Sequence, residues 1–127
     1  MGPYAQVDSI ALLAHCSAME RSQFLRLSAE VLEYLDEKLG GLEHDDLDVD
    51  LGGDVLTLAF ADGGKFIINA HSAAGQVWMA AGTEAWHFDY DEASKTWIAG
   101  RTGDELLATV ERTVGPRIGV DVKLRSA

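Results

Sequence analysis

The chain is poor in cysteine and in positive charge. Its 127 residues include one cysteine, Cys16, so an intramolecular disulfide, a CxxC redox pair and a self-contained thiolate metal centre are excluded. Only 10 lysines and arginines accompany 21 aspartates and glutamates, and the formal net charge is −11. Such a chain repels nucleic acids and anionic membranes, and it attracts cations or basic protein surfaces. Any metal must therefore be held mainly by oxygen ligands.

Long apolar runs and familiar catalytic motifs are also absent from the sequence. No run approaches the roughly 20 apolar residues that span a bilayer. The short apolar stretch 10–14 has no Lys or Arg before it, which argues against a signal peptide and for a cytoplasmic protein. There is no GxSxG, no HExxH and no phosphate-binding glycine loop, so we expect no catalytic residue. The alternative is an acid/base pair of His87 and Asp89, two residues apart on one strand.

What the chain does have is a set of regular apolar patterns. One domain is expected from the length, and the apolar share of 47% suffices for a core. One apolar stripe at helical spacing predicts a helix that ends at Gly40-Gly41. The stripe consists of Phe24, Leu27, Val31, Leu35 and Leu39, and Leu32 lies at its edge.

The middle of the chain changes to strand patterns. Short links, such as the turn Asp62-Gly63-Gly64, predict a largely antiparallel meander. The six predicted strands are 47–51, 55–60, 65–71, 76–81, 85–90 and 97–99.

A second helix follows the strands. Thr102 and Glu105 fit a capping box, and Gly115-Pro116 is expected to end the helix before a polar tail over the domain edge, 117–127. Its apolar face consists of Leu106, Leu107, Val110 and Val114. Because each helix has one apolar stripe, the predicted fold is α+β: a two-layer α/β sandwich with both helices on one face of the sheet.

Acidic residues crowd the first helix and the first strand. Clustered carboxylates with an imidazole nearby suit iron, manganese, calcium or magnesium, in an open and weak site. The alternative is a solvated acidic surface that only aids solubility. The candidate ligands are Glu30, Glu33, Asp36, Glu37, Glu43, His44, Asp45, Asp46, Asp48 and Asp50.

Strand alternation predicts a second candidate site on the uncovered face of the sheet. A tryptophan among amides and imidazoles is typical of a protein-binding hot spot. The alternative is that Trp78 packs under a loop or under the C-terminal tail. The residues expected to face outward together are Asn69, His71, Gln76, Trp78, His87 and Asp89.

From Met19 to Val114 the sequence resembles the frataxin family. The order and spacing of several segments carry the resemblance: Leu56-Thr57-Leu58, Phe60, Gly63, Lys65, Ile67-Ile68-Asn69, Gln76-Val77-Trp78, His87-Phe88-Asp89, Trp97-Ile98 and Gly103. A single domain over 19–127, preceded by an extension over 1–18, is expected from this match.

The resemblance implies a non-catalytic role in iron–sulfur cluster assembly. It implies weak binding of ferrous and ferric iron on the acidic residues, with no organic cofactor. It also implies docking on the cysteine desulfurase and the iron–sulfur scaffold protein through Asn69, Gln76 and Trp78, by a monomer or an iron-induced oligomer. A ferroxidase or iron-storage enzyme, and an acidic docking domain without metal, are the alternatives.

Two departures from the family pattern are visible. Gly40-Gly41 stands where bacterial relatives often have an acidic pair, which thins the acidic surface at its corner. His71 and Ala73 stand where the family has Gln and Pro, so this turn is expected to differ in shape.

Overall fold

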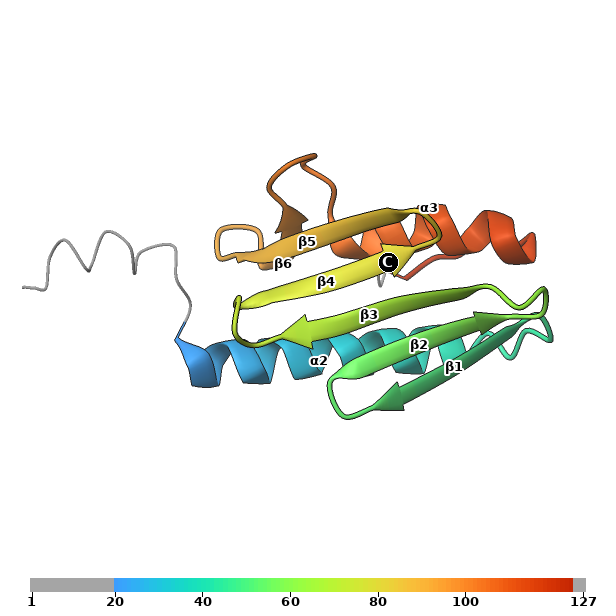
Figure 1. Ribbon diagram of the computed structural model, residues 1–127, viewed down its shortest axis with the longest axis horizontal. Helices are drawn as coiled ribbons and strands as arrows, with labels where there is room; N and C mark the ends of the chain where they lie inside the picture. The colour runs from blue at the N-terminus through green and yellow to red at the C-terminus, as the bar shows by residue number, and fades with distance from the viewer. Residues whose placement is uncertain (1–19, 125–127) are drawn as a thin grey trace, which may run out of the picture.

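One layer of the molecule is a six-stranded sheet, and two helices form the other layer. In the computed structural model, residues 20–124 are described; the expected extension 1–18, with Cys16, lies outside them. Both helices lie on the same side of the sheet (Figure 1), so the predicted α+β sandwich is confirmed. The elements are α2 (Arg21–Gly40), β1 (Leu47–Gly52), β2 (Val55–Phe60), β3 (Lys65–His71), β4 (Gln76–Ala81), β5 (Glu84–Asp91), β6 (Thr96–Ala99) and α3 (Leu106–Ile118).

The sheet is an antiparallel meander in the order β1-β2-β3-β4-β5-β6. One edge, β6, is partly covered by an isolated bridge between Ile98 and Glu105, whereas β1 pairs only with β2 among the described residues. The register places Asn69 opposite Trp78, and Trp78 opposite His87. Three neighbouring strands therefore bring these side chains into one row on the face that the helices leave uncovered.

The core lies between the sheet and the helices. Alternate strand residues point inward, and Leu56, Ile68, Val77 and Phe88 have no exposed surface. The buried face of α2 consists of Phe24, Ser28, Leu32, Leu35 and Leu39. None of the helices in the described range has the length and hydrophobicity needed to cross a bilayer.

The predicted stripe of α2 packs on the core, but its most buried line lies slightly to one side of the predicted one. Leu27 and Val31 are only half-buried, and Ser28 and Leu32 occupy the centre instead. Both sets fit a period of 3.6 residues, so hydrophobicity alone favoured the leucine and valine. Ser28 can be buried because its hydroxyl donates to the Leu25 carbonyl over 3.3 Å.

The two ends of α3 also differ from the prediction. Glu105 is itself the cap, since its carboxylate accepts hydrogen bonds from the backbone N–H groups of Leu107 and Ala108 at 3.0 and 3.1 Å. The helix continues through Pro116 to Ile118 and is closed by Gly119 at φ 70°. Proline so near the end removes one intrahelical hydrogen bond and leaves no further turn to disrupt.

The segment after α3 is part of the core, and not a polar cover over the domain edge. Val122 and Leu124 are 3% and 1% exposed. The Leu124 carbonyl accepts a hydrogen bond from the Tyr34 hydroxyl of α2, and its N–H donates to the Glu111 carboxylate of α3 over 2.7 Å. The tail therefore ties the two helices to each other.

An arginine clamp joins the end of α3 to the β2–β3 turn. Nη2 of Arg117 donates to both carboxylate oxygens of Asp62, at 2.9 and 3.0 Å, and the guanidinium lies 4.6 Å from the centre of the Phe60 ring. A Cβ on Gly64 would lie 2.3 Å from that Nη2, so any other residue there would require the guanidinium to shift. The hydrogen bond from the Gly64 N–H, with the nearby Arg117 charge, lowers the pKa of Asp62.

The tail supplies the first stability prediction. Leu124→Ala removes a fully buried side chain and should lower the free energy of unfolding by about 2–4 kcal/mol, measured by urea denaturation. Val120→Ala is the matched control: Val120 is 37% exposed in the same segment and its truncation should cost much less. Equal losses for the two variants would contradict the proposed role of the tail.

The lowered pKa of Asp62 gives a dependence of stability on pH. Because the folded pKa lies below the unfolded value of about 3.9, the contribution of Asp62 is present above that value and is lost as the pH falls through the folded pKa. Asp62→Asn should therefore reduce the drop in melting temperature between about pH 5 and pH 3. Asp121→Asn, in an exposed pair with Lys123, should leave the drop as in the parent chain.

Candidate functional site: an acidic ridge and an aromatic face

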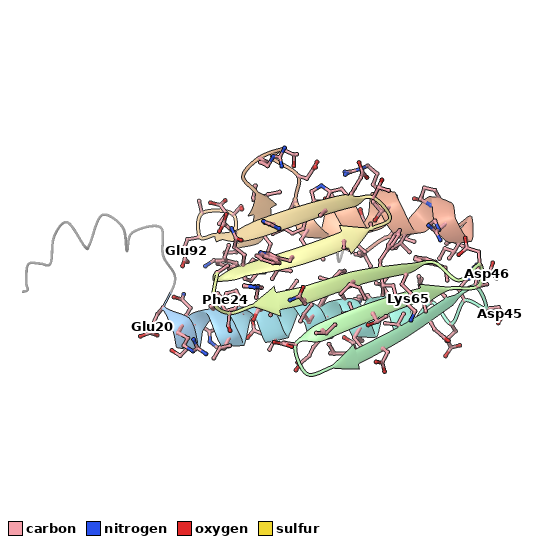
Figure 2. All side chains as sticks on the ribbon, viewed as in Figure 1. Glu20, Phe24, Asp45, Asp46, Lys65 and Glu92 are labelled. Atoms are coloured by element: carbon pink, nitrogen blue, oxygen red, sulfur yellow. The ribbon has the colours of Figure 1, made fainter. Side chains whose placement is uncertain are left out.

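The ten predicted metal ligands, here called the acidic ridge, follow one another from α2 to β1. It runs along α2 from Glu30 to Glu37, turns the corner before β1, and continues to Asp50. Asp36 and His44 are half-buried, and the other eight side chains are exposed. Figure 2 shows Asp45 and Asp46 at one end of the molecule, directly before β1 begins. Eight of the ten residues therefore lie on α2 and at the corner before β1, whereas Asp48 and Asp50 alternate with the inward residues of β1 and point to the uncovered side of the sheet.

The corner of the ridge combines several sources of negative potential. The last turn of α2 points its carbonyl groups toward this corner, which corresponds to about half a negative charge. Glu43 has a left-handed backbone with φ 49°, a conformation that a non-glycine residue rarely adopts. His44 accepts the Asp46 N–H at its Nδ1 over 3.1 Å, which leaves its Nε2 nitrogen facing away from that contact. The summed field of the helix end and the neighbouring carboxylates favours cations at this corner.

The ridge does not form a closed cage. Among residues 20–124, no three His, Cys, Asp or Glu side chains converge in a group that could hold a metal ion. Glu30 lies 3.7 Å from Arg26 and is the one ridge carboxylate in an ion pair within the described range. Exposed, separated oxygens suit a hydrated hard or borderline cation held by one or two carboxylates at a time. Such a site binds weakly and exchanges its ion readily.

The second predicted site is the aromatic face, formed by Asn69, His71, Gln76, Trp78 and His87. Trp78 is sandwiched between two imidazoles: the ring centres lie 3.8 Å from His71 and 4.3 Å from His87, with interplanar angles of 14° and 15°. The indole N–H donates to Gln76 over 2.8 Å, and Gln76 donates in turn to Asp89 over 3.2 Å. The outward-facing residues are thus a connected and fixed array.

Trp78 is therefore not packed under another part of the described chain. The described tail lies against the helices, on the opposite side of the sheet. The two imidazoles cover the ring surfaces of Trp78, and the Trp78 side chain is half-buried. The sequence analysis missed the stack; the available signal was the diagonal relation between His71 and Trp78 across paired strands, which lies within reach of aromatic side chains.

A groove of about 720 Å³ opens beside the aromatic face, and it was also missed. Gln76, His87 and Asp89 form one wall, and the loop 100–104 forms the other. Asp104 accepts the indole N–H of Trp86 at 3.1 Å and lies 3.7 Å from Arg112. Thr102, the Trp86 N–H and Arg112 together lower the pKa of Asp104. Asp89 bonds Gln76, so the described contacts give no support to a His87–Asp89 acid/base pair.

These observations define a class: a helix–sheet–helix sandwich with an acidic edge and an uncovered aromatic sheet face. The frataxin-like domain family matches residues 17–120, which is most of the chain. The chain belongs to the frataxin family.

Similar proteins agree with this assignment. The iron–sulfur cluster assembly protein CyaY of Thioalkalivibrio sulfidiphilus is 42% identical over 79 residues, 62% of this chain and 74% of the relative. The frataxin of Psychromonas ingrahamii has the same fold, with a TM-score of 0.77 and 30% identity over 85% of this chain and all of that one. Trimeric yeast frataxin complexed with ferrous iron matches with a TM-score of 0.64 and 26% identity, covering 80% of this chain and 88% of its own.

Crowding on the ridge should cost stability. Glu33 and Glu37 are one helical turn apart and carry like charges, so replacing both by Gln should raise the melting temperature at low salt. The gain should shrink as the salt rises from about 0.01 M to about 1 M, where the Debye length falls to roughly 3 Å. An unchanged or lower melting temperature at low salt would contradict this expectation. The control is Glu84→Gln, which removes one exposed carboxylate outside the ridge, on the β4–β5 hairpin.

Proposed function

We propose that this chain is a cytoplasmic iron-binding protein of iron–sulfur cluster biogenesis. It holds ferrous and ferric iron weakly on the acidic ridge, and it docks through the aromatic face on the cysteine desulfurase and its scaffold protein. There it acts as an iron donor or as an iron-dependent regulator. The observation that carries this proposal is the separation of the two sites: one lies on the α2–β1 edge and the other on the outer face of β3, β4 and β5.

Iron binding is supported by the donor chemistry of the ridge. Carboxylate oxygens dominate, and one imidazole, His44, stands among them. Because the carboxylates are exposed and dispersed, a bound ion keeps most of its water. The ridge therefore discriminates little among divalent cations. The kinship with CyaY and the ferrous complex of yeast frataxin favour iron as the cargo.

Docking is supported by the preorganised Trp78. A large ring that is already fixed loses little side-chain entropy on binding, and tryptophan is the residue type most enriched at hot spots. The net charge of −11 favours fast encounter with a basic partner surface. The negative charge of the ridge would then help to steer the encounter, and the aromatic face would contact the partner.

An anaerobic Fe(II) titration followed by backbone amide NMR tests the iron site. Amide signals from Glu30 to Asp50 should broaden and disappear, while those from Asn69 to Trp78 remain. The variant Glu33→Gln/Glu37→Gln/Asp45→Asn should lose the effect, and Glu92→Gln/Asp121→Asn, with exposed acids elsewhere, should keep it. No change at millimolar iron would refute the iron role. Steady oxygen consumption per added iron in air would point instead to a ferroxidase.

Truncation of Trp78 tests the docking face. Trp78→Ala should weaken binding to the purified desulfurase–scaffold complex by about 2 kcal/mol, roughly 30-fold in Kd, measured by calorimetry. The control is Leu25→Ala, which removes a 45% exposed apolar side chain from α2, outside the aromatic face. Its Kd should stay within about twofold of the parent value. Equal effects of the two substitutions would refute the assignment of the face.

A further inference from the structure

Two of the three stacked rings on the aromatic face can change charge. Imidazole is the side chain whose protonation state normally changes between about pH 5 and pH 8. His71 and His87 cover the two sides of the Trp78 indole at 3.8 and 4.3 Å between ring centres. A proton taken up by either imidazole therefore arrives directly against the residue that dominates the face.

Protonation of His71 also disturbs the chain around it. Its Nδ1 accepts the backbone N–H of Ala74 over 3.2 Å, in the turn that joins β3 to β4. A protonated Nδ1 carries its own hydrogen and can no longer accept, so two N–H groups would face each other. The ring must then turn, or the turn must open. Either movement breaks the hydrogen bond between His71 and Ala74.

His87 responds differently, because no described hydrogen bond holds its ring. Its charged neighbours are Asp89 on the same strand face, and Glu84, Arg101, Asp104 and Arg112 around the shared groove. An imidazolium there keeps its place over the indole, where a cation is attracted by the ring. Near His71 the charged neighbour is Asp54, whose carbonyl accepts the Ala70 N–H over 2.9 Å. Protonation of both rings thus adds two positive charges directly beside Trp78.

We propose that the aromatic face is a proton-controlled docking surface, which holds a basic partner while His71 and His87 are neutral and releases it as they become charged. This inference rests on the proposed docking function. Like charges across the interface oppose binding, and protonation of His71 removes the hydrogen bond that ties its ring to the Ala74 N–H beside Trp78.

The test measures the Kd for the desulfurase–scaffold complex at pH 7.5 and 5.5 and at constant ionic strength. For the parent chain the Kd should rise roughly tenfold toward the acid side. The planar amides of His71→Gln/His87→Gln cannot take up a proton in this range. For this variant the ratio of the Kd at pH 5.5 to the Kd at pH 7.5 should fall close to the value that titration of the partner alone would give. Leu25→Ala changes no titratable group and lies outside the face, so it should keep the ratio of the parent chain.

The free protein provides a second readout that does not involve the partner. Between pH 7.5 and 5.5 the amide signal of Ala74 and the indole N–H signal of Trp78 should shift together, and His71→Gln should abolish the shift of Ala74. Equal Kd ratios in the parent chain and the double variant would overturn the inference and leave the docking function intact. Absence of binding at pH 7.5 would overturn the docking function and the inference with it. Fixed Ala74 and Trp78 signals would overturn the inference alone.

Discussion

The structure depends on the burial of one face of one sheet. Six antiparallel strands alternate their side chains, so a single inward set, including Leu56, Ile68, Val77 and Phe88, requires cover. The two amphipathic helices provide that cover on one side only. The other side of the sheet is consequently left to solvent, and its central residues are free to be polar, aromatic or titratable. The acidic ridge follows from the same constraint, because the outer surface of α2 and the edge strand β1 have no layer above them.

Much of this arrangement could be predicted, since period and turn chemistry are local properties. All six strands were placed to within two residues of their observed ends, and the outward set on β3, β4 and β5 follows from alternation alone. The errors arose where a non-local contact decides between options that fit equally well. The side of α2 that meets the sheet is centred on Ser28 and Leu32, with Leu27 and Val31 at its margin, and Leu124 is buried because two helices offer it partners.

The candidate sites show the same division. Composition located the acidic ridge, because a run of carboxylates on one helix and one strand needs no tertiary knowledge. The stack of His71, Trp78 and His87 depends on the register of three strands and on side-chain rotamers, which no single segment contains. The groove beside His87 depends on the path of the loop 100–104, which is held by bonds from Ala99 and Trp86 to Asp104.

The open edge of β1 gives the ridge a second consequence, for association between copies of the chain. An unpaired edge strand presents its backbone groups to any other extended chain, and charged side chains along it are a common protection against such pairing. Asp48 and Asp50 supply that protection here, since two copies brought edge to edge would place like charges together. Each cation that neutralises one of these carboxylates weakens the barrier. On the proposed function, cation loading of the ridge and self-association of the protein would therefore depend on the same side chains.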